Sequence, residues 1–257
     1  MRDPDPGPPA AGQAAEAEAG ILPVRAGQQP RPTVLLACPI MRELVGPRLS
    51  GTGVPEIYMD YGLHLRPKRM APALQERLDA LPGPSTVLLG YGLCGAGLSG
   101  LRAGPHTLII PRTHDCIAIL LGSHRAYMRA QAERPGTYYL TRGWLESNNH
   151  PLGQYRDCLD RYGEDAAGHV VDAMYSHYTD LVYLASTREE LEECRPRVRE
   201  IAEFCAARWD MTYTGVVGSA AMIEGLLAAP LNPRGLGEDF LVIPPGGRVE
   251  SRMFLRD

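Results

Sequence analysis

The chain has 257 residues, of which 44% are hydrophobic and 22% charged, and its formal net charge is -4 at pH 7. These values are typical of a globular protein, and the slight acidity argues against a surface for nucleic acid or an anionic membrane. No apolar run approaches the roughly 18 residues of a membrane span, and the first ten residues lack the regions of a signal peptide. We therefore expect a cytoplasmic protein.

Strand and helix signals alternate through the first half of the chain. Residues 1–32 have few large apolar side chains, and we expect a disordered tail. Short apolar runs predict strands at 33–37, 55–61, 86–89 and 107–110, and helices are expected after Pro39, at 70–81 and at 116–133. This alternation predicts an α/β fold with a mostly parallel, doubly wound, Rossmann-like sheet in a domain of residues 33–145.

The second half has a less regular pattern. Its expected elements are strands at 137–140, 181–185, 212–217 and 240–243, helices at 154–162, 166–178 and 188–208, and an irregular loop over 142–153. We expect residues 146–257 to form a second, smaller α/β lobe or to continue the first domain.

Three of the six cysteines, Cys38, Cys94 and Cys116, directly follow predicted strands. Ligands of open α/β sheets bind outside the carboxyl ends of the strands, so these side chains should meet at one edge. His64 and His114 should leave the same edge. The other cysteines fall within predicted helices, and none of the six forms a C-x-x-C pair.

The local electrostatics at these positions favour thiolates. Pro39 suits a first helical position, which places Cys38 at an N-cap, and Cys116 falls in a first helical turn, where the helix dipole lowers a thiol pKa. Cys94 lies in a glycine-rich loop able to present backbone amides. A single cysteine is often a small buried apolar residue, but three together favour a shared metal site of Cys38, Cys94, Cys116 and His64.

Other polar residues near these strand ends are candidates for chemistry and binding. Asp115, His114 and Arg112 are the catalytic candidates, although Asp115 is also placed to cap a helix. The substrate-binding candidates are Tyr91, Gly92, Gly95, Arg142 and Trp144. The spacing of Gly90, Gly92 and Gly95 also matches a dinucleotide fingerprint, but only eleven residues separate Gly95 from Thr107, too few for a full crossover helix.

Several strings of the chain resemble a known family. ACPIMREL, GLHLRP, GYGLCGAGLSGLRAG, IPRTHDCIAILLGS and GTYYLTRGW occur in the order found in the uncharacterised domain of unknown function 1638. The resemblance implies that Cys38, His64, Cys94, Asp115, Cys116, Gly136 and Trp144 belong to recurrent motifs. It also implies a setting near corrinoid-dependent methyl transfer from methylated amines, which is association and not mechanism.

Three functional hypotheses follow. The first is a thiolate-ligated zinc site with an open position, in an enzyme or accessory factor for methyl transfer, working with a small-molecule substrate and a corrinoid protein. The second is a [4Fe–4S] cluster with an open iron that acts on a small hydroxy or carboxylate substrate, as a lyase would. The third is a non-enzymatic protein that binds a corrinoid, a metal or a small molecule.

Overall fold

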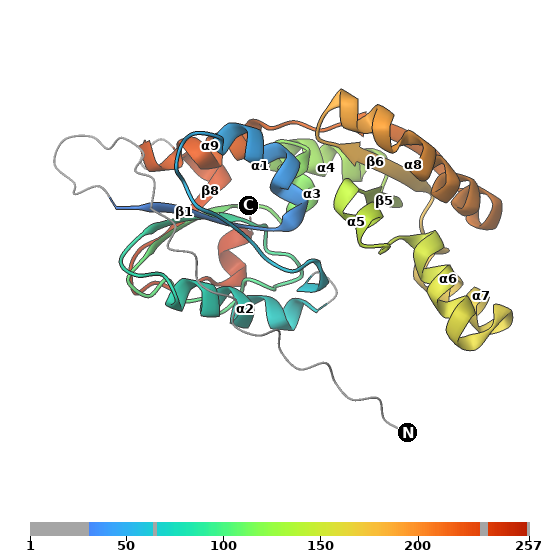
Figure 1. Cartoon of the computed structure of the whole chain (residues 1–257), viewed down its shortest axis with the longest axis horizontal. Helices are drawn as coiled ribbons and strands as arrows, with labels where there is room; N and C mark the ends of the chain where they lie inside the picture. The colour runs from blue at the N-terminus through green and yellow to red at the C-terminus, as the bar shows by residue number, and fades with distance from the viewer. Residues whose placement is uncertain (1–30, 64–65, 232–235, 256–257) are drawn as a thin grey trace, which may run out of the picture.

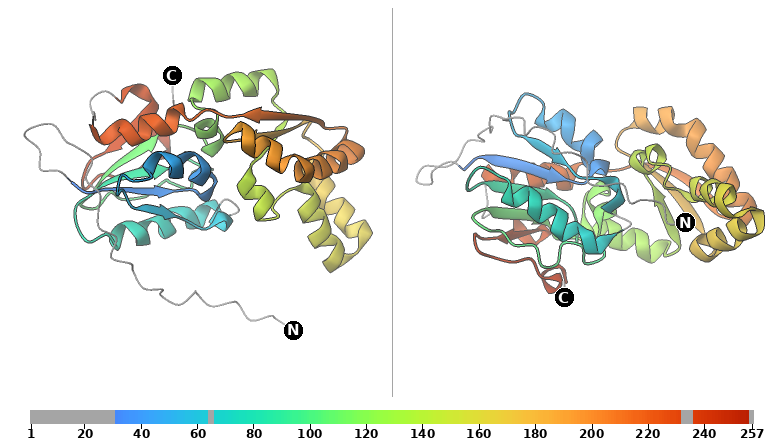
Figure 2. Two further views of the ribbon diagram at one scale, coloured as in Figure 1. Left: turned by 45° about the horizontal axis from the view of Figure 1, so that its top comes forward. Right: turned by 60° about the horizontal axis from the view of Figure 1, so that its bottom comes forward.

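The computed structural model describes residues 31–63, 66–231 and 236–255. Nearly all of the expected tail, and His64, therefore lie outside the described residues. Figures 1 and 2 show two lobes side by side, each built around its own sheet, with the helical hairpin of α6 and α7 at the far end of the second. The expected α/β class with a mostly parallel first sheet and a second lobe is confirmed.

The first lobe contains a five-stranded sheet in the order β2-β1-β3-β4-β8. Its strands are β1 (Thr33–Ala37), β2 (Glu56–Tyr58), β3 (Thr86–Gly90), β4 (Thr107–Pro111) and β8 (Phe240–Ile243). The first four are parallel, and β8 pairs antiparallel with β4. Strands β1, β3 and β4 are almost entirely buried, as expected for apolar strands covered on both faces.

Helices cover both faces of this sheet. Helix α2 lies on one face, and α1 and α9 lie on the other (Figure 1). The helical elements of this lobe are η1 (Pro39–Met41), α1 (Arg42–Leu49), η2 (Tyr61–Leu63), α2 (Pro67–Asp79), α3 (Cys116–Leu120), α4 (His124–Glu133), α9 (Ala221–Ala228), η3 (Ala229–Leu231), η5 (Gly237–Asp239) and η6 (Ser251–Phe254). In α2, Met70, Leu74 and Leu78 recur every fourth residue and are buried, which is the stripe that a helix packs against a sheet.

The second lobe contains a parallel sheet in the order β5-β6-β7. Its elements are β5 (Thr137–Leu140), α5 (Arg142–Glu146), α6 (Pro151–Tyr162), α7 (Glu164–Tyr175), β6 (Asp180–Ala185), α8 (Arg188–Trp209) and β7 (Thr212–Val217). Each lobe has its own hydrophobic core, and the partly buried Trp144 packs against both. Trp144 therefore lies where the lobes meet.

Two local predictions are wrong. The helix expected over 116–133 is two helices, because Gly122 adopts a positive φ of 86° and the Ser123 hydroxyl then caps α4 by accepting from the Ala126 amide. The irregular loop expected over 142–153 contains α5 and the first turn of α6, which the His150 side chain caps.

The strands divide between the sheets differently from the two expected residue ranges. Strand β5 lies before residue 146 but pairs with β6, and β8 lies near the end of the chain but pairs with β4. The boundaries at 32 and 145 stay predictions. Within the described residues, no helix is both long and apolar enough to cross a bilayer.

Candidate functional site

The three cysteines are carried by the first turns beyond β1, β3 and β4. Cys38 directly follows β1, and its amide donates to the carbonyl of Gly90 at the end of β3. Cys94 lies in the loop after β3, and Cys116 is the first residue of α3, in the segment after β4. The parallel strands thus bring all three to one edge of the sheet, as the rule for open α/β sheets predicts.

Backbone contacts hold the Cys94 loop against the segment after β4. The amides of Leu93 and Cys94 donate to the carbonyls of Thr113 and His114, at 2.9 Å each. A Cβ on Gly92 would lie 2.7 Å from the backbone of Asp115, so only glycine allows this approach. Glycine is therefore required at position 92 because two loops approach each other closely there. This close approach positions Cys94 beside Cys116.

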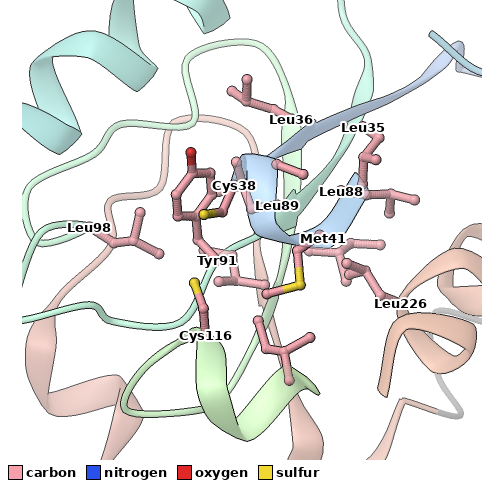
Figure 3. Close-up of a cluster of buried hydrophobic side chains, with 14 of the residues drawn as sticks. Leu35, Leu36, Cys38, Met41, Leu88, Leu89, Tyr91, Leu98, Cys116 and Leu226 are labelled. Carbon is pink, nitrogen blue, oxygen red and sulfur yellow. The ribbon is translucent and has the colours of Figure 1, made fainter. Parts of the chain in front are cut away.

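The thiols are in direct contact. The Sγ atoms of Cys94 and Cys116 lie 3.4 Å apart, and Cys116 also has a hydrogen bond with the Cys38 thiol. None of the six cysteines forms a disulfide, and these three are buried. Figure 3 shows the side chains of Cys38 and Cys116 directed toward the ring of Tyr91. The structure therefore gathers the three predicted cysteines into one cluster, which we call the thiol cluster.

The electrostatics of the cluster differ from the expectation of lowered thiol pKa values. The hydrogen bond with Cys38 and burial raise the pKa of Cys116 well above its ordinary value, although the bonds with Cys94 and the Gly92 backbone act in the opposite direction. The prediction of a lowered pKa at Cys116 is thus wrong. The contact with Cys38 and burial thus disfavour a thiolate at Cys116, and α3 has only five residues, so its dipole is small.

Tyr91 forms one wall of the cluster. It is 1% exposed, and burial, followed by the neighbouring Cys38, Cys116 and Cys94, raises its pKa. Its hydroxyl therefore stays protonated at neutral pH. Negative charge on the Cys116 sulfur is opposed by its burial and by the Cys38 contact unless a cation compensates it.

A cavity of about 450 Å³ between the two lobes reaches Cys94 and Cys116. Its lining includes four aromatic rings from the second lobe: Tyr138, Trp144, Tyr175 and Tyr178. Asp115 is the one charged residue among the described lining residues, which include no Lys or Arg. The thiols thus lie at one side of an aromatic, weakly acidic cavity.

The contacts of the three catalytic candidates are mainly structural, as Asp115, His114 and Arg112 show in turn. The Asp115 carboxylate accepts hydrogen bonds from the amides of Ile117 and Ala118 and from the Tyr127 hydroxyl, so its expected capping role is confirmed. His114 is exposed, and its ring lies 5.2 Å from that of His124. Arg112 donates to the carbonyls of Met253 and Leu255. Their catalytic roles stay predictions.

The substrate-binding candidates are divided between two cavities. Gly95 and Trp144 line the cavity at the thiol cluster. Arg142 lies on a separate cavity of about 50 Å³ and pairs with Glu193 at 2.5 Å. Tyr91 and Gly92 are buried behind the cysteines. The structure thus separates Arg142 from the other candidates, and their binding roles stay predictions.

Three tyrosines of the cavity wall, Tyr138, Tyr175 and Tyr178, are not among the candidates from the sequence. Tyr138 occurs within the family-like string GTYYLTRGW, which offered a signal for it. Tyr175 and Tyr178 come from the end of α7 and the turn after it, and no local pattern marks them. They reach the site only because the second sheet packs beside the first, and this long-range contact is not visible in local periodicity.

Within the ranges that the structure describes, no group of three or more His, Cys, Asp or Glu side chains could hold a metal ion as arranged. A model for a family described as a protein of unknown function (DUF1638) matches residues 58–218. No curated protein and no solved structure matches the chain.

Proposed function

Since this chain belongs to the DUF1638 family, whose description assigns no activity, we propose its function from its own residues. We propose that Cys38, Cys94 and Cys116 form a thiolate-ligated metal site, with zinc as the first candidate, in an enzyme or accessory factor of corrinoid-linked methyl transfer from methylated amines. The supporting observation is the 3.4 Å contact between the Cys94 and Cys116 sulfurs beside the 450 Å³ cavity.

The sulfur spacing favours a single ion over a cluster. Two thiolates bound to one tetrahedral zinc lie about 3.8 Å apart, given Zn–S bonds near 2.3 Å. From the observed distance of 3.4 Å, the two sulfurs would have to move apart by only a few tenths of an ångström. The ligands of a [4Fe–4S] cluster are held by different irons and lie roughly 6 to 7 Å apart, so the cluster hypothesis needs a much larger rearrangement.

Metal binding requires the cluster to open. The described residues do not form a ready metal site, so the proposal includes a small movement of the thiol side chains around the ion. His64 stays a predicted ligand outside the described residues. A bound cation would compensate the charge that burial and the Cys38 contact oppose at Cys116, so metal binding and thiol deprotonation are coupled.

The cavity favours a cationic small molecule. Its lining includes four aromatic rings, the groups whose π faces attract cations, and has Asp115 but no Lys or Arg among the described residues. A methylated ammonium group fits this chemistry better than an anion does. When bound, zinc would supply a position for a substrate or a thiolate of controlled nucleophilicity, and the aromatic wall would orient the methylated group toward the sulfurs.

The first test is the metal content of the full chain purified without oxygen. We expect about one zinc per chain by elemental analysis, and a loss of at least about tenfold in zinc affinity for Cys94→Ser and Cys116→Ser. Cys194→Ser is the matched control, because Cys194 is a buried thiol with a hydrogen bond to Tyr183 and lies in α8. Cys194→Ser should keep the zinc.

Two outcomes would contradict the proposal. Folded protein that takes up no zinc, iron or other thiophilic metal would exclude the metal site. Equal zinc binding by Cys94→Ser and the parent chain would place the metal elsewhere. A protein that binds zinc and a methylated amine without turnover, even with a corrinoid protein present, would be a carrier and not an enzyme.

A further inference from the structure

The contact between Cys94 and Cys116 supports a second chemistry besides metal binding. We propose that these two residues form a redox-active dithiol, which a peroxide that enters the neighbouring cavity converts to a reversible Cys94–Cys116 disulfide. This proposal depends on the geometry of the two thiols and applies whether or not a metal binds.

The two sulfurs are already positioned for bond formation. Their separation of 3.4 Å is about 1.4 Å longer than a disulfide bond. Cys94 belongs to a loop outside the sheet, so a change in its side-chain torsion and a small shift of the loop can close this gap. The bond therefore needs no rearrangement of the strands.

Cys94 is the better partner of Cys116 than Cys38 is. Cys38 directly follows β1, and its amide is bonded to Gly90 of β3, which fixes its backbone to the sheet. Cys38 is also only 1% exposed and is not part of the cavity lining. Cys94 is 9% exposed and lines the cavity with Cys116, so an oxidant that enters the cavity reaches these two thiols.

The reaction proceeds in two balanced steps. The Cys94 sulfur attacks one oxygen of hydrogen peroxide, the O–O bond breaks, and a sulfenic acid and one water form. The Cys116 sulfur then attacks the Cys94 sulfur, the S–O bond breaks, and the second water leaves with the thiol proton. Two thiols lose two electrons, and one peroxide is reduced to two waters.

Peptide mapping of the oxidised full chain tests this proposal. The protein is treated with one equivalent of hydrogen peroxide in the presence of a metal chelator, alkylated and digested with trypsin. Cleavage after Lys and Arg, except before Pro, puts Cys38, Cys94 and Cys116 on three different peptides, 26–42, 78–102 and 113–125. The disulfide can therefore be assigned from the mass of the linked pair.

We expect peptides 78–102 and 113–125 to be linked, with loss of two of the six thiols that alkylation otherwise modifies and recovery of both on reduction with dithiothreitol. Cys38→Ser and the control Cys194→Ser should form the same link, and Cys94→Ser should not. If Cys94→Ser fails to fold, the map of the parent chain still decides the question.

Three results would overturn the proposal: no linked peptides from folded protein, a link through peptide 26–42, or Cys94 oxidised to a sulfinic acid without a link. Because a chelator is present, the outcome is separate from the metal test. A chain that binds no zinc yet forms the link loses only the metal proposal, and a chain that binds zinc but forms no link loses only this one.

Discussion

Cys94 adopts a φ of 49°, and the next two residues, Gly95 and Ala96, also have positive φ values of 64° and 66°. A residue with a side chain pays of order 1–3 kcal/mol for such a conformation. The amide bonds of Leu93 and Cys94 to the segment after β4 hold the loop in this shape. Strain of this kind recurs at functional sites, so it adds a backbone argument for a role of Cys94.

The backbone at position 94 predicts an unusual order of stability among variants that lack the thiol. Both Cys94→Gly and Cys94→Ala remove the sulfur, but only glycine adopts the left-handed conformation without cost. We expect Cys94→Gly to be more stable than Cys94→Ala by about 1 kcal/mol, measured by urea unfolding. Elsewhere alanine is usually the more stable of the two, so a more stable alanine variant would show that this φ is not kept in solution.

The chemistry of single residues was only partly predictable from the sequence. The strand-end positions of Cys38, Cys94 and Cys116 follow from short apolar runs, and the capping position of Asp115 follows from its residue type. The raised pKa of Cys116 was not predictable, because it arises from contact with Cys38 and from burial. Neither is encoded within a few residues of position 116.

At the scale of elements, His150 determines where α6 begins. Its Nδ1 accepts a hydrogen bond from the Gly153 amide at 3.1 Å, so the ring must be neutral. Burial, followed by the charges of Arg197 and Arg156, lowers the His150 pKa from 6.5 to about 4. Pro151 after a histidine is a weaker start signal than Pro after Ser or Asp, which explains why the sequence suggested a loop.

The lowered His150 pKa predicts a loss of stability in weak acid. In the unfolded chain this histidine takes a proton near pH 6.5, but in the folded chain only near pH 4. Its contribution to the free energy of unfolding is therefore complete above about pH 6.5. This contribution decreases as the pH falls toward 4, with a slope below about 1.4 kcal/mol per pH unit. Urea unfolding between pH 7 and 4.5 measures this.

His150→Asn is the informative comparison, because asparagine keeps an N-cap acceptor but does not titrate. We expect its free energy of unfolding to depend less on pH over this interval. If the free energy of unfolding depends equally on pH in the variant and in the parent chain, the acid sensitivity belongs to other groups.

The break between α3 and α4 shows where element boundaries could have been better predicted. Gly122 followed by Ser123 is a recognisable stop and start signal, and the structure uses it in this way. The close packing of Gly122 on Ser219 could not be predicted, because 96 residues separate them in the sequence. Local signals thus identify ends of elements, and long-range contacts decide which signals are used.

At the scale of the whole molecule, the segment that matches the family model is shorter than the segment that forms the fold. The match covers residues 58–218, but β1 and the first two residues of β2 lie before it, and β8 lies after it. Strand β1 pairs with both β2 and β3, so its removal leaves a gap inside the sheet. The pairing of β8 with β4 was not predictable, because an isolated run such as FLVI does not identify its partner strand.

These pairings predict that the matched segment does not fold by itself. A protein of residues 58–218 lacks β1, β8 and Cys38, and we expect it to aggregate or to show no cooperative thermal transition by circular dichroism. A protein of residues 31–257 retains every strand described here and is the control. A cooperative transition of the 58–218 protein would contradict this prediction and show that the matched segment is sufficient for folding.

The return of β8 to the first sheet also has a consequence for biosynthesis. The complete second sheet, β5 to β7, is encoded between β4 and β8. As the chain leaves the ribosome from its N-terminus, the second sheet can form while the edge of β4 still has no partner. This edge is covered only after residues 240–243 have been translated. Until then the nascent protein carries an unpaired apolar strand, which is the kind of surface that chaperones protect.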